Sequence, residues 1–243
     1  MSLRDWIIYE DRAILALAKP AGLAAQGGGG IVESLDEMLK ELARNPRTIP
    51  RLAHRLDRET SGIIVAGRTK TATAALSAAF ANRDVAKTYL AIVCGGAPTP
   101  QEGRMDAPLV RTRKGRVDLI RIARPGEEGA QDASTIYATR AAQGAAALVQ
   151  AEPQTGRMHQ IRVHLASIGR PIFGDGKYGG LFGLGGVPAQ RVMLHAAALD
   201  LPHPEGGRLR LEAPPPKDFQ DAVAALGLGS AQSPASVAAE PVP

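Results

Sequence analysis

Short apolar runs, separated by polar and glycine-containing turns, follow one another along most of the chain. The runs at 6–9 and 14–19 flank a polar turn and predict a β-hairpin. Apolar runs at 62–66 and 87–94 are typical of buried strands. Further strands are expected at 103–123, 133–151, 191–201 and 208–212. The hydrophobic pattern therefore predicts a protein built mainly from strands.

Fewer segments are expected to be helical. They lie at 35–44, 71–82, 157–168 and 218–226. Ser34 and Glu37 have the spacing of a capping box, which favours a helix start at this point. The inward stripe of the third helix is expected to consist of Met158, Ile161, Leu165 and Ile168. Because strands outnumber helices and mostly follow one another directly, the pattern predicts an α+β fold on a mainly antiparallel sheet.

The composition is that of a globular protein. Apolar residues make up 44% of the 243 residues and charged residues 22%, whereas aromatic residues make up only 4%, so aliphatic side chains must build most of the core. The stretch 229–243 is rich in small residues and proline, and we expect a flexible tail there. The net charge of +5 is compatible with a polyanionic partner but does not establish one.

Several classes of site are excluded or disfavoured. The single cysteine, Cys94, excludes an intrachain disulfide and a cysteine-based zinc site. The segment 174–179 matches G-x-G-x-x-G without the preceding strand and following helix of a dinucleotide site, so it predicts a structural loop. His159 and His164 are badly spaced for a shared metal. With neither a signal-peptide core nor an apolar run long enough to span a bilayer, a cytoplasmic protein without a membrane partner is expected.

One candidate site lies just before the strand at 62–66. One aspartate, Asp57, is surrounded in the sequence by four basic residues. These are Arg51, His54, Arg55 and Arg58. Such crowding favours an ionised carboxylate at neutral pH. An ionised aspartate in this setting can be a nucleophile, a metal ligand or a structural anchor of its loop.

Two further polar clusters accompany Asp57. Thr155, His159 and Arg162 form a polar stripe on the expected helix at 157–168, which can line a cleft or face solvent. The other cluster is basic and consists of Arg111, Arg113, Lys114, Arg116, Arg121 and Arg124. On paired strands, this basic cluster can follow RNA phosphates or form an ordinary solvated hairpin opposed only by Asp118.

Five sequence blocks occur in a characteristic order between roughly residues 6 and 216. They are Lys19-Pro20-Ala21-Gly22-Leu23; His54-Arg55-Leu56-Asp57-x-x-Thr60-Ser61-Gly62; Lys87-x-Tyr89-x-Ala91-x-Val93; Thr155-Gly156-Arg157-x-His159-Gln160-Ile161-Arg162-x-His164 with Gly174-Asp175 and Tyr178-Gly179; and Leu194-His195-Ala196 with His203-Pro204. This ordered set resembles the signature of the RluA-type pseudouridine synthases. One departure is that Ala24-Ala25-Gln26 and four glycines stand where the family often has a His-Pro pair.

The resemblance implies a single catalytic domain at 1–228, built on a curved, mainly antiparallel mixed sheet with flanking helices. It implies isomerisation of specific uridines in structured RNA, either ribosomal or transfer RNA, to pseudouridine, without a cofactor or metal. A monomer is expected. Because the chain begins almost at the first block, no accessory RNA-binding domain is expected before it.

The resemblance also implies catalytic roles for Asp57, Tyr89 and Arg162. Asp57 would be the nucleophile, attacking the sugar or the base, and Arg162 would pair with it. Tyr89 would stack on the base or assist proton removal. Substrate-binding residues are expected to be His54, Arg55, Arg157, His159, Gln160 and Leu194, and contacts to the RNA backbone are expected from Arg111, Arg113, Lys114 and Arg116. Arg55 is expected to hold the extruded nucleotide or to fill the space that it leaves.

Two other functions stay open. A catalytically silent RNA-binding module on the same fold is the first, although the presence of Asp57, Tyr89 and Arg162 argues against it. A glycosidic-bond hydrolase that uses Asp57 and Glu59 is the second. These two carboxylates lie in one loop, and nothing in the sequence makes them an opposed acid and base pair.

Overall fold

The computed structural model describes residues 2–28, 33–43, 48–114 and 117–230. Two predictions lie outside these residues, namely most of the expected tail (231–243) and the contact to RNA expected from Arg116. The side chain of Lys114 is not described either.

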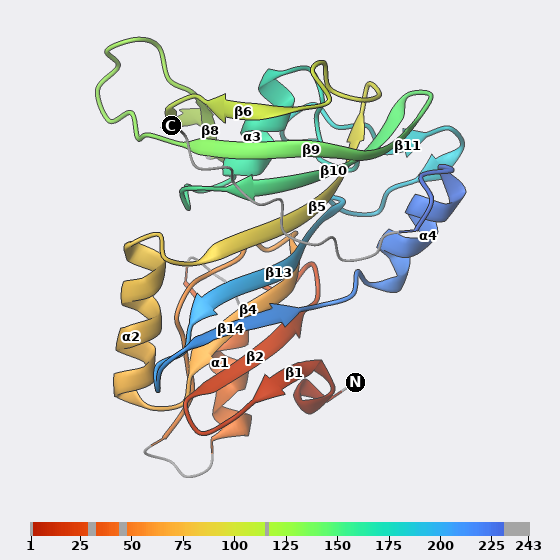
Figure 1. The fold of residues 1–243 in the computed structure, drawn as a ribbon. Helices are drawn as coiled ribbons and strands as arrows, with labels where there is room; N and C mark the ends of the chain where they lie inside the picture. The colour runs from red at the N-terminus through yellow and green to blue at the C-terminus, as the bar shows by residue number, and fades with distance from the viewer. Residues whose placement is uncertain (1, 29–32, 44–47, 115–116, 231–243) are drawn as a thin grey trace.

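Ten strands form one sheet that runs through the whole molecule (Figure 1). Its path is β1-β2-β4-β13-β5-β10-β9-β6, with β14 paired to β13 and β3 paired to β4. The strands are β1 (Ile7–Glu10), β2 (Ile14–Lys19), β3 (Arg51–Leu52), β4 (Ser61–Gly67), β5 (Ala86–Cys94), β6 (Glu102–Asp106), β9 (Ser134–Gln143), β10 (Ala146–Pro153), β13 (Leu194–Pro202) and β14 (Arg208–Glu212). Two small hairpins stand apart, β7 (Leu109–Lys114) with β8 (Val117–Ile122) and β11 (Gly183–Leu184) with β12 (Val187–Pro188). The predicted α+β class with a mainly antiparallel mixed sheet is confirmed.

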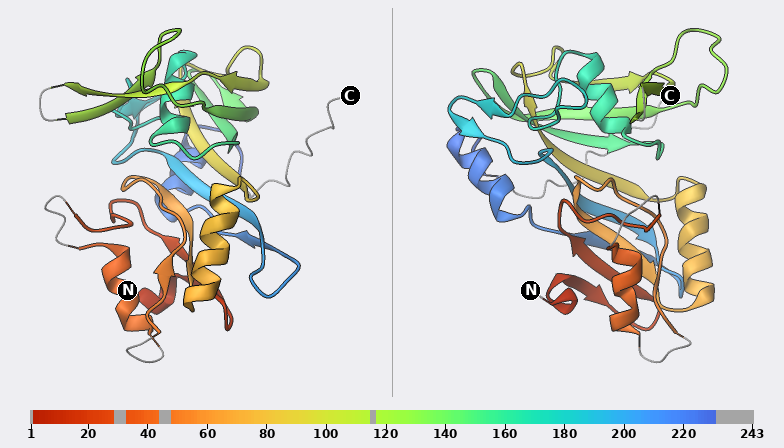
Figure 2. Two further views of the ribbon diagram at one scale, coloured as in Figure 1. Left: turned by 90° about the vertical axis from the view of Figure 1, so that its left-hand side faces the viewer. Right: turned by 180° about the vertical axis from the view of Figure 1, so that it is seen from behind.

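Helices cover both faces of the sheet. They are α1 (Leu35–Met38), α2 (Lys70–Ala81), α3 (Gln160–Ser167) and α4 (Lys217–Ala225), together with the 3-10 turns η1 (Leu3–Trp6) and η2 (Leu39–Leu42). Successive residues of a strand point to opposite faces. Ile14 and Ile63 therefore pack in the cluster that contains α2, whereas Leu15 and Ile64 pack with α1 and η2. The left-hand view of Figure 2 shows α1 and α2 on either side of these strands.

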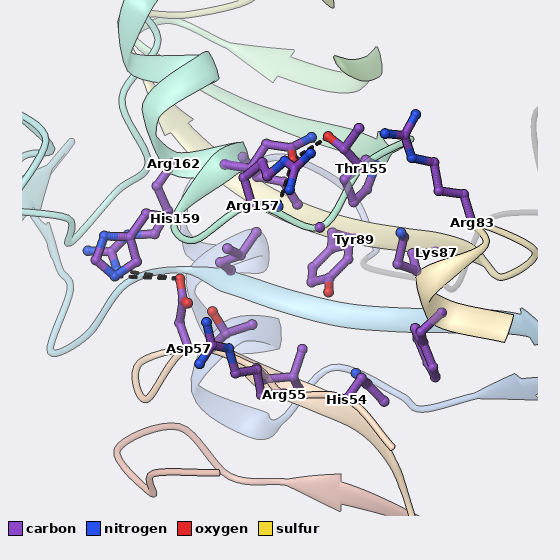
Figure 3. Close-up of a pocket in the computed structure, with 18 of the residues that line it drawn as sticks. His54, Arg55, Asp57, Arg83, Lys87, Tyr89, Thr155, Arg157, His159 and Arg162 are labelled. Atoms are coloured by element: carbon purple, nitrogen blue, oxygen red, sulfur yellow. Dashed lines mark hydrogen bonds and ion pairs between the residues drawn. The ribbon is translucent and has the colours of Figure 1, made fainter. Parts of the chain in front are cut away.

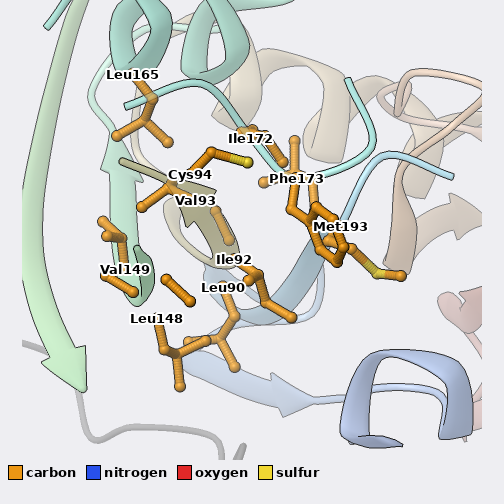
Figure 4. Packing of buried hydrophobic residues seen from close by; sticks show 14 of the residues in the cluster. Leu90, Ile92, Val93, Cys94, Leu148, Val149, Leu165, Ile172, Phe173 and Met193 are labelled. Carbon is orange, nitrogen blue, oxygen red and sulfur yellow. The ribbon is translucent and has the colours of Figure 1, made fainter. Parts of the chain in front are cut away.

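The largest core cluster lies where β5 and β10 pair (Figure 4). Leu165 from α3 and Phe219 from α4 both belong to it. Aliphatic side chains dominate this core, as the low aromatic content predicts. The cluster gives β5 a rigid setting, and β5 is the strand that carries Tyr89.

Two predicted helices are shorter than expected. Over 35–44, regular α-helix covers only 35–38 and continues as the 3-10 turn η2, and the Ser34 side chain makes no capping hydrogen bond. Over 157–168, α3 begins at Gln160 because His159 has a left-handed backbone, with φ of 54°. The polar stripe predicted on one helix face is therefore divided between a turn and a helix. Ile168 is 37% exposed rather than inward-facing.

No helix in the described ranges has the length and apolar character needed to cross a membrane.

Candidate active site

A cleft of about 340 Å³ opens between the loop 53–60, which precedes β4, and the segment 153–162, which joins β10 to α3. Tyr89 from β5 lies between these two walls (Figure 3). A second hollow of about 840 Å³ adjoins the first. The two hollows share Arg55, Leu56, Asp57, His159 and Arg162. The structure thus brings the Asp57 cluster and the 155–162 cluster to one place.

The turn that presents Asp57 leads directly into β4. The Thr60 N–H donates to the Asp57 carbonyl at 3.1 Å. Ser61 and Gly62 then form the parallel pairing with β13, where a β carbon on Gly62 would lie 2.1 Å from the carbonyl oxygen of Ala196. Gly62 also has φ of +115°. The close approach and the positive φ both require glycine at this position of the motif.

A buried lysine ties the N-terminal loop to the same turn. Lys19 is 1% exposed, and its ammonium group donates to three backbone carbonyls. These belong to Pro20, Leu23 and Arg58, at 2.8, 2.9 and 3.3 Å. Burial lowers the pKa of Lys19 to about 8, although the nearby charges of Glu59 and Asp57 oppose this effect. Through these hydrogen bonds, the Lys19-Pro20 block holds the loop that carries Asp57 in place.

Arg162 is held beside Asp57 by a second carboxylate, Asp175. Its Nε and Nη2 atoms donate to the two Asp175 oxygens at 2.7 and 2.8 Å, which leaves Nη1 3.6 Å from Asp57 Oδ2. The Arg162 side chain is 6% exposed and that of Asp175 1%. Burial acts to lower the pKa of Arg162, but the hydrogen bond to Asp175 and the charges of both carboxylates outweigh it and raise that pKa. The predicted pairing of Arg162 with Asp57 is present, and its geometry depends on Asp175.

His159 approaches the same carboxylate oxygen. Its Nε2 lies 3.9 Å from Asp57 Oδ2 (Figure 3), and its Nδ1 lies 2.6 Å from the Tyr178 hydroxyl. Burial lowers the pKa of His159 to about 4, although the charge of Asp57 opposes the shift. The imidazole is therefore neutral at pH 7.

Tyr89 and Leu194 supply an apolar surface in the cleft. The hydroxyl of Tyr89 makes no hydrogen bond within the described residues. Burial raises the pKa of Tyr89, and the charge of Asp57 raises it further, so the side chain is a neutral phenol at pH 7. Leu194, at the start of β13, lines the same cleft and is buried. An aromatic ring and an aliphatic side chain beside a carboxylate can accommodate a planar, uncharged base.

Two of the predicted binding residues have their polar atoms engaged by the protein. The Val65 N–H donates to His54 Nε2, the His54 ring stacks on Phe80, and burial lowers the pKa of His54 to about 3. The Gln160 amide is fully hydrogen-bonded to protein groups. These are the Thr155 hydroxyl, the Arg157 N–H, the Ser134 carbonyl and the Thr135 hydroxyl. Both side chains line the cleft, and their contacts with protein groups stabilise its walls.

Arg55 and Arg157 leave more of their charge available. Arg55 is exposed and lines both hollows, and its guanidinium group has no hydrogen-bond or ion-pair partner in the described part of the chain. Arg157 lines the first hollow and donates from Nε to the Asp132 carbonyl at 3.0 Å. Among the predicted binding residues, Arg55 and Arg157 are therefore best placed to bind an anionic ligand.

More of the positive charge on the β7–β8 hairpin is paired with carboxylates than its sequence indicates. Arg111 pairs with Asp118 at 2.6 Å, as charge alternation in the sequence allows. Arg121, however, pairs with Glu127, a partner that the sequence analysis missed. Arg113 is exposed, and Lys177 reaches the hairpin by donating to the Asp118 carbonyl at 2.6 Å. Exposed cations thus remain on the hairpin beside the cleft.

Three functional side chains had no role assigned from the sequence. Asp175 and Tyr178 lie in the 174–179 loop, which the structure confirms as a loop, and both face the Asp57 environment. In the sequence, both belong to the fourth motif block, which gave neither of them a role of its own. Lys19 was indicated in the sequence only as part of the first motif block. His164, which the sequence disfavours as a metal ligand, is buried on α3 between the Thr135 hydroxyl and the Ala107 carbonyl.

Comparison with known proteins decides the family. The family model described as RNA pseudouridylate synthase matches residues 13–167. The chain belongs to the RNA pseudouridylate synthase family. As a pseudouridine synthase it is an isomerase that acts on uridine in RNA, and the resemblance to the RluA-type enzymes is confirmed. The described residues contain no group of three or more His, Cys, Asp or Glu side chains arranged to hold a metal.

Curated relatives of this synthase cover most of its length. It is 36% identical over 241 residues to ribosomal large subunit pseudouridine synthase D of Xanthomonas campestris, an alignment covering 93% of this chain and 71% of the relative. It is 37% identical over 221 residues to ribosomal large subunit pseudouridine synthase C of Escherichia coli K12, covering 88% of this chain and 67% of the relative.

Solved structures give the same family. Human RNA pseudouridylate synthase domain containing 4 superposes with a TM-score of 0.76 at 29% identity, covering 93% of this chain and 94% of that one. Human RNA pseudouridylate synthase domain containing 1 gives 0.70 at 26% identity, covering 86% and 83%. The fold of this synthase is therefore that of pseudouridine synthase domains.

Proposed function

We propose that this pseudouridine synthase modifies uridine in ribosomal RNA and that Asp57 is its nucleophile. The relatives named as ribosomal large subunit synthases support this substrate class. The observation that carries the proposal is the arrangement at Asp57, where Asp175 fixes Arg162 so that Nη1 lies 3.6 Å from the carboxylate. An ionised carboxylate, held in a partly enclosed cleft by a permanent cation, is a competent nucleophile.

The reaction breaks the bond between ribose C1′ and uracil N1 and forms a bond between C1′ and C5. The Asp57 carboxylate attacks the sugar or the base and is released when the new bond forms. The proton on C5 leaves to solvent, and N1 takes up a proton. Tyr89 is proposed to stack on the uracil as a neutral phenol, because its raised pKa keeps the hydroxyl protonated at pH 7 and leaves almost no phenolate to act as a base. Leu194 forms the opposing apolar contact.

The remaining side chains of the cleft are proposed to bind the RNA. A stacked uridine must leave its helix, at a cost of a few kcal/mol. Arg55, exposed at the mouth of both hollows, is proposed to hold the extruded nucleotide or to fill the vacated space. Arg157 and the exposed cations of the β7–β8 hairpin are proposed to contact phosphates. His54 and Gln160 are proposed to position the cleft walls.

One further exposed group favours RNA at the second hollow. The Phe182 side chain is 59% exposed, lines this hollow and lies against Gly176, where a β carbon would be 2.7 Å from its ring. Arg58 and Lys177 line the same hollow. An exposed aromatic ring among cations is typical of surfaces that bind unpaired nucleotides.

We further propose that residues 1–228 act as one catalytic domain, as a cytoplasmic monomer without cofactor or metal. Light scattering of the full chain tests the monomer, and activity in the presence of a chelator tests metal independence. Unchanged turnover in the chelator is the expected result.

The deciding assay follows tritium released from transcripts labelled at uracil C5. We expect release from ribosomal RNA and none from the Asp57→Asn variant, because an amide cannot serve as the nucleophile. Release from Asp57→Asn would refute the assigned nucleophile. Absence of release with intact RNA binding would favour a silent RNA-binding module, and free uracil as a product would favour a hydrolase.

Arg55 has its own test. Arg55→Ala is expected to slow turnover more on a folded RNA than on an unstructured fragment containing the same uridine. The Arg12→Ala variant, at an exposed position that lines neither hollow, is a matched control for loss of positive charge. Equal losses on both substrates would contradict a role in base extrusion.

A further inference from the structure

Tyr178 occupies a position that connects the β7–β8 hairpin with the catalytic cleft. Its hydroxyl accepts a hydrogen bond from the backbone N–H of Ile120 in β8 at 3.2 Å and lies 2.6 Å from His159 Nδ1. Its ring meets the His159 ring edge-on, at 5.5 Å between centroids, and lies 5.1 Å from the guanidinium carbon of Arg162. Tyr178 thus contacts both side chains that approach Asp57.

The contacts of this hydroxyl determine where the imidazole carries its proton. The Ile120 N–H occupies one lone pair of the Tyr178 oxygen, so the hydroxyl hydrogen needs an acceptor, and His159 Nδ1 is the nearest one. A neutral imidazole has one donor and one acceptor nitrogen. If Nδ1 accepts, Nε2 carries the hydrogen and points a donor toward Asp57. The opposite tautomer would leave the Tyr178 hydrogen without an acceptor among the described residues and turn a lone pair toward the carboxylate.

The charged surroundings of His159 agree with this assignment. Asp57 and Asp175 face it with negative charge, and Arg162 and Lys177 with positive charge, while burial keeps the ring neutral. The backbone of His159 is in the left-handed region, with φ of 54°. For a residue other than glycine such a conformation is strained, and it is retained where the surrounding structure requires it. Here it places the imidazole between Tyr178 and Asp57.

We propose that Tyr178 is a positioning residue that sets the Nε2–H tautomer of His159. The donors of His159 and Arg162 then converge on one oxygen of Asp57. Both the His159 Nε2 and the Arg162 Nη1 contacts are to Oδ2, at 3.9 and 3.6 Å (Figure 3). The other oxygen, Oδ1, has no hydrogen-bond partner in the described residues and is the one presented for attack. This last step rests on the proposed role of Asp57, whereas the tautomer of His159 does not.

The tautomer can be measured directly on the full-length protein. With ¹⁵N-labelled histidine, long-range proton–nitrogen spectra at pH 7 distinguish a protonated Nε2 from a protonated Nδ1. We expect His159 to be protonated at Nε2 in the wild-type protein and to become a mixture of tautomers in Tyr178→Phe. A wild-type His159 protonated at Nδ1 would overturn the proposal. Because no substrate is needed, this result is independent of whether the proposed function holds.

A kinetic cycle tests the consequence for Asp57. Tyr178→Phe is expected to lower kcat by roughly tenfold, the loss that one hydrogen bond produces, with little change in KM. His159→Gln keeps a donor near the Nε2 position, so adding Tyr178→Phe to it should cause no further loss. Additive losses would show that Tyr178 acts only on local packing and would refute the proposal.

Tyr137→Phe is the matched control, because the Tyr137 hydroxyl donates to the Pro100 carbonyl and that side chain does not line the cleft around Asp57. Its kcat is expected to stay unchanged. If Asp57→Asn retained activity, the nucleophile assignment would be wrong. The nitrogen spectra would still show which tautomer His159 adopts.

Discussion

Replacing Asp175 by asparagine removes one negative charge from a buried ion pair and leaves its shape nearly unchanged. Arg162 keeps a guanidinium that is 6% exposed, and the new amide places a donor against its donors. Breaking a buried pair from one side costs about 3–5 kcal/mol. Asp57, 26% exposed and 3.6 Å from Nη1, compensates in part. We therefore expect the free energy of unfolding to fall by about 3 kcal/mol, the low end of that range.

Urea unfolding of the wild-type protein and Asp175→Asn, followed by circular dichroism, measures this loss. Asp84→Asn is the matched control, because its pair with Arg208 at 2.9 Å is solvent-exposed on both sides. Such exposed pairs contribute about 0–1 kcal/mol. Turnover of Asp175→Asn is expected to fall at least tenfold at temperatures where the variant is folded, since Arg162 is no longer held toward Asp57.

A second change separates the two effects. Adding Arg162→Met to Asp175→Asn removes the uncompensated cation, so stability should recover while turnover stays low. If Asp175→Asn unfolds at the same urea concentration as Asp84→Asn and turns over normally, the reasoning from the buried pair is wrong.

Three further outcomes are expected. Gly62→Ala should destabilise the protein by well over 1 kcal/mol in urea unfolding, because its β carbon would collide with the β13 backbone, whereas Gly144→Ala, with φ of 54° and nothing within 4 Å, should cost less. Burial lowers the pKa of His195 to about 4, so the unfolded chain takes up a proton first, and this group alone should lower the stability by roughly 3 kcal/mol from pH 6.5 to 4. His195→Gln should remove this share of the pH dependence, and an unchanged slope would contradict the prediction. Phe182→Ala should weaken RNA binding in a filter assay without changing thermal stability; unchanged affinity would exclude stacking there.

Much of the fold could be predicted because strand burial follows local sequence. The runs at 14–19 and 87–94 became β2 and β5 almost without change in bounds, since each is apolar enough to be buried. The helix at 157–168 was overestimated for a physical reason. His159 adopts a left-handed conformation that its own propensity does not favour, because contacts to Tyr178 and Asp57 hold it there.

The candidate site was predicted less completely. Asp57, Tyr89 and Arg162 were found through their motif blocks, and the structure brings all three to one cleft. Asp175 was missed as a partner because it is 13 residues from Arg162 in sequence and sits in a glycine-rich loop. The structural role of Gln160 could not be predicted either. Its amide N–H groups donate to residues of β9 that lie 25 residues or more away in the sequence. Such long-range partners leave no local pattern.

The parallel pairing of β4 with β13 has a consequence for the order in which parts of the chain fold during synthesis. It joins Ser61 and Gly62 to His195 and Ala196, positions more than 130 residues apart, and it is the one parallel strand pairing in the described chain. Contacts between residues so distant in sequence form slowly because a long loop must close first. During synthesis, the pairing of Ser61 and Gly62, which follow the loop carrying Asp57, can form only after β13 has emerged. A nascent chain that ends before residue 194 therefore has every catalytic side chain proposed here but lacks β13 and the Leu194 side of the cleft.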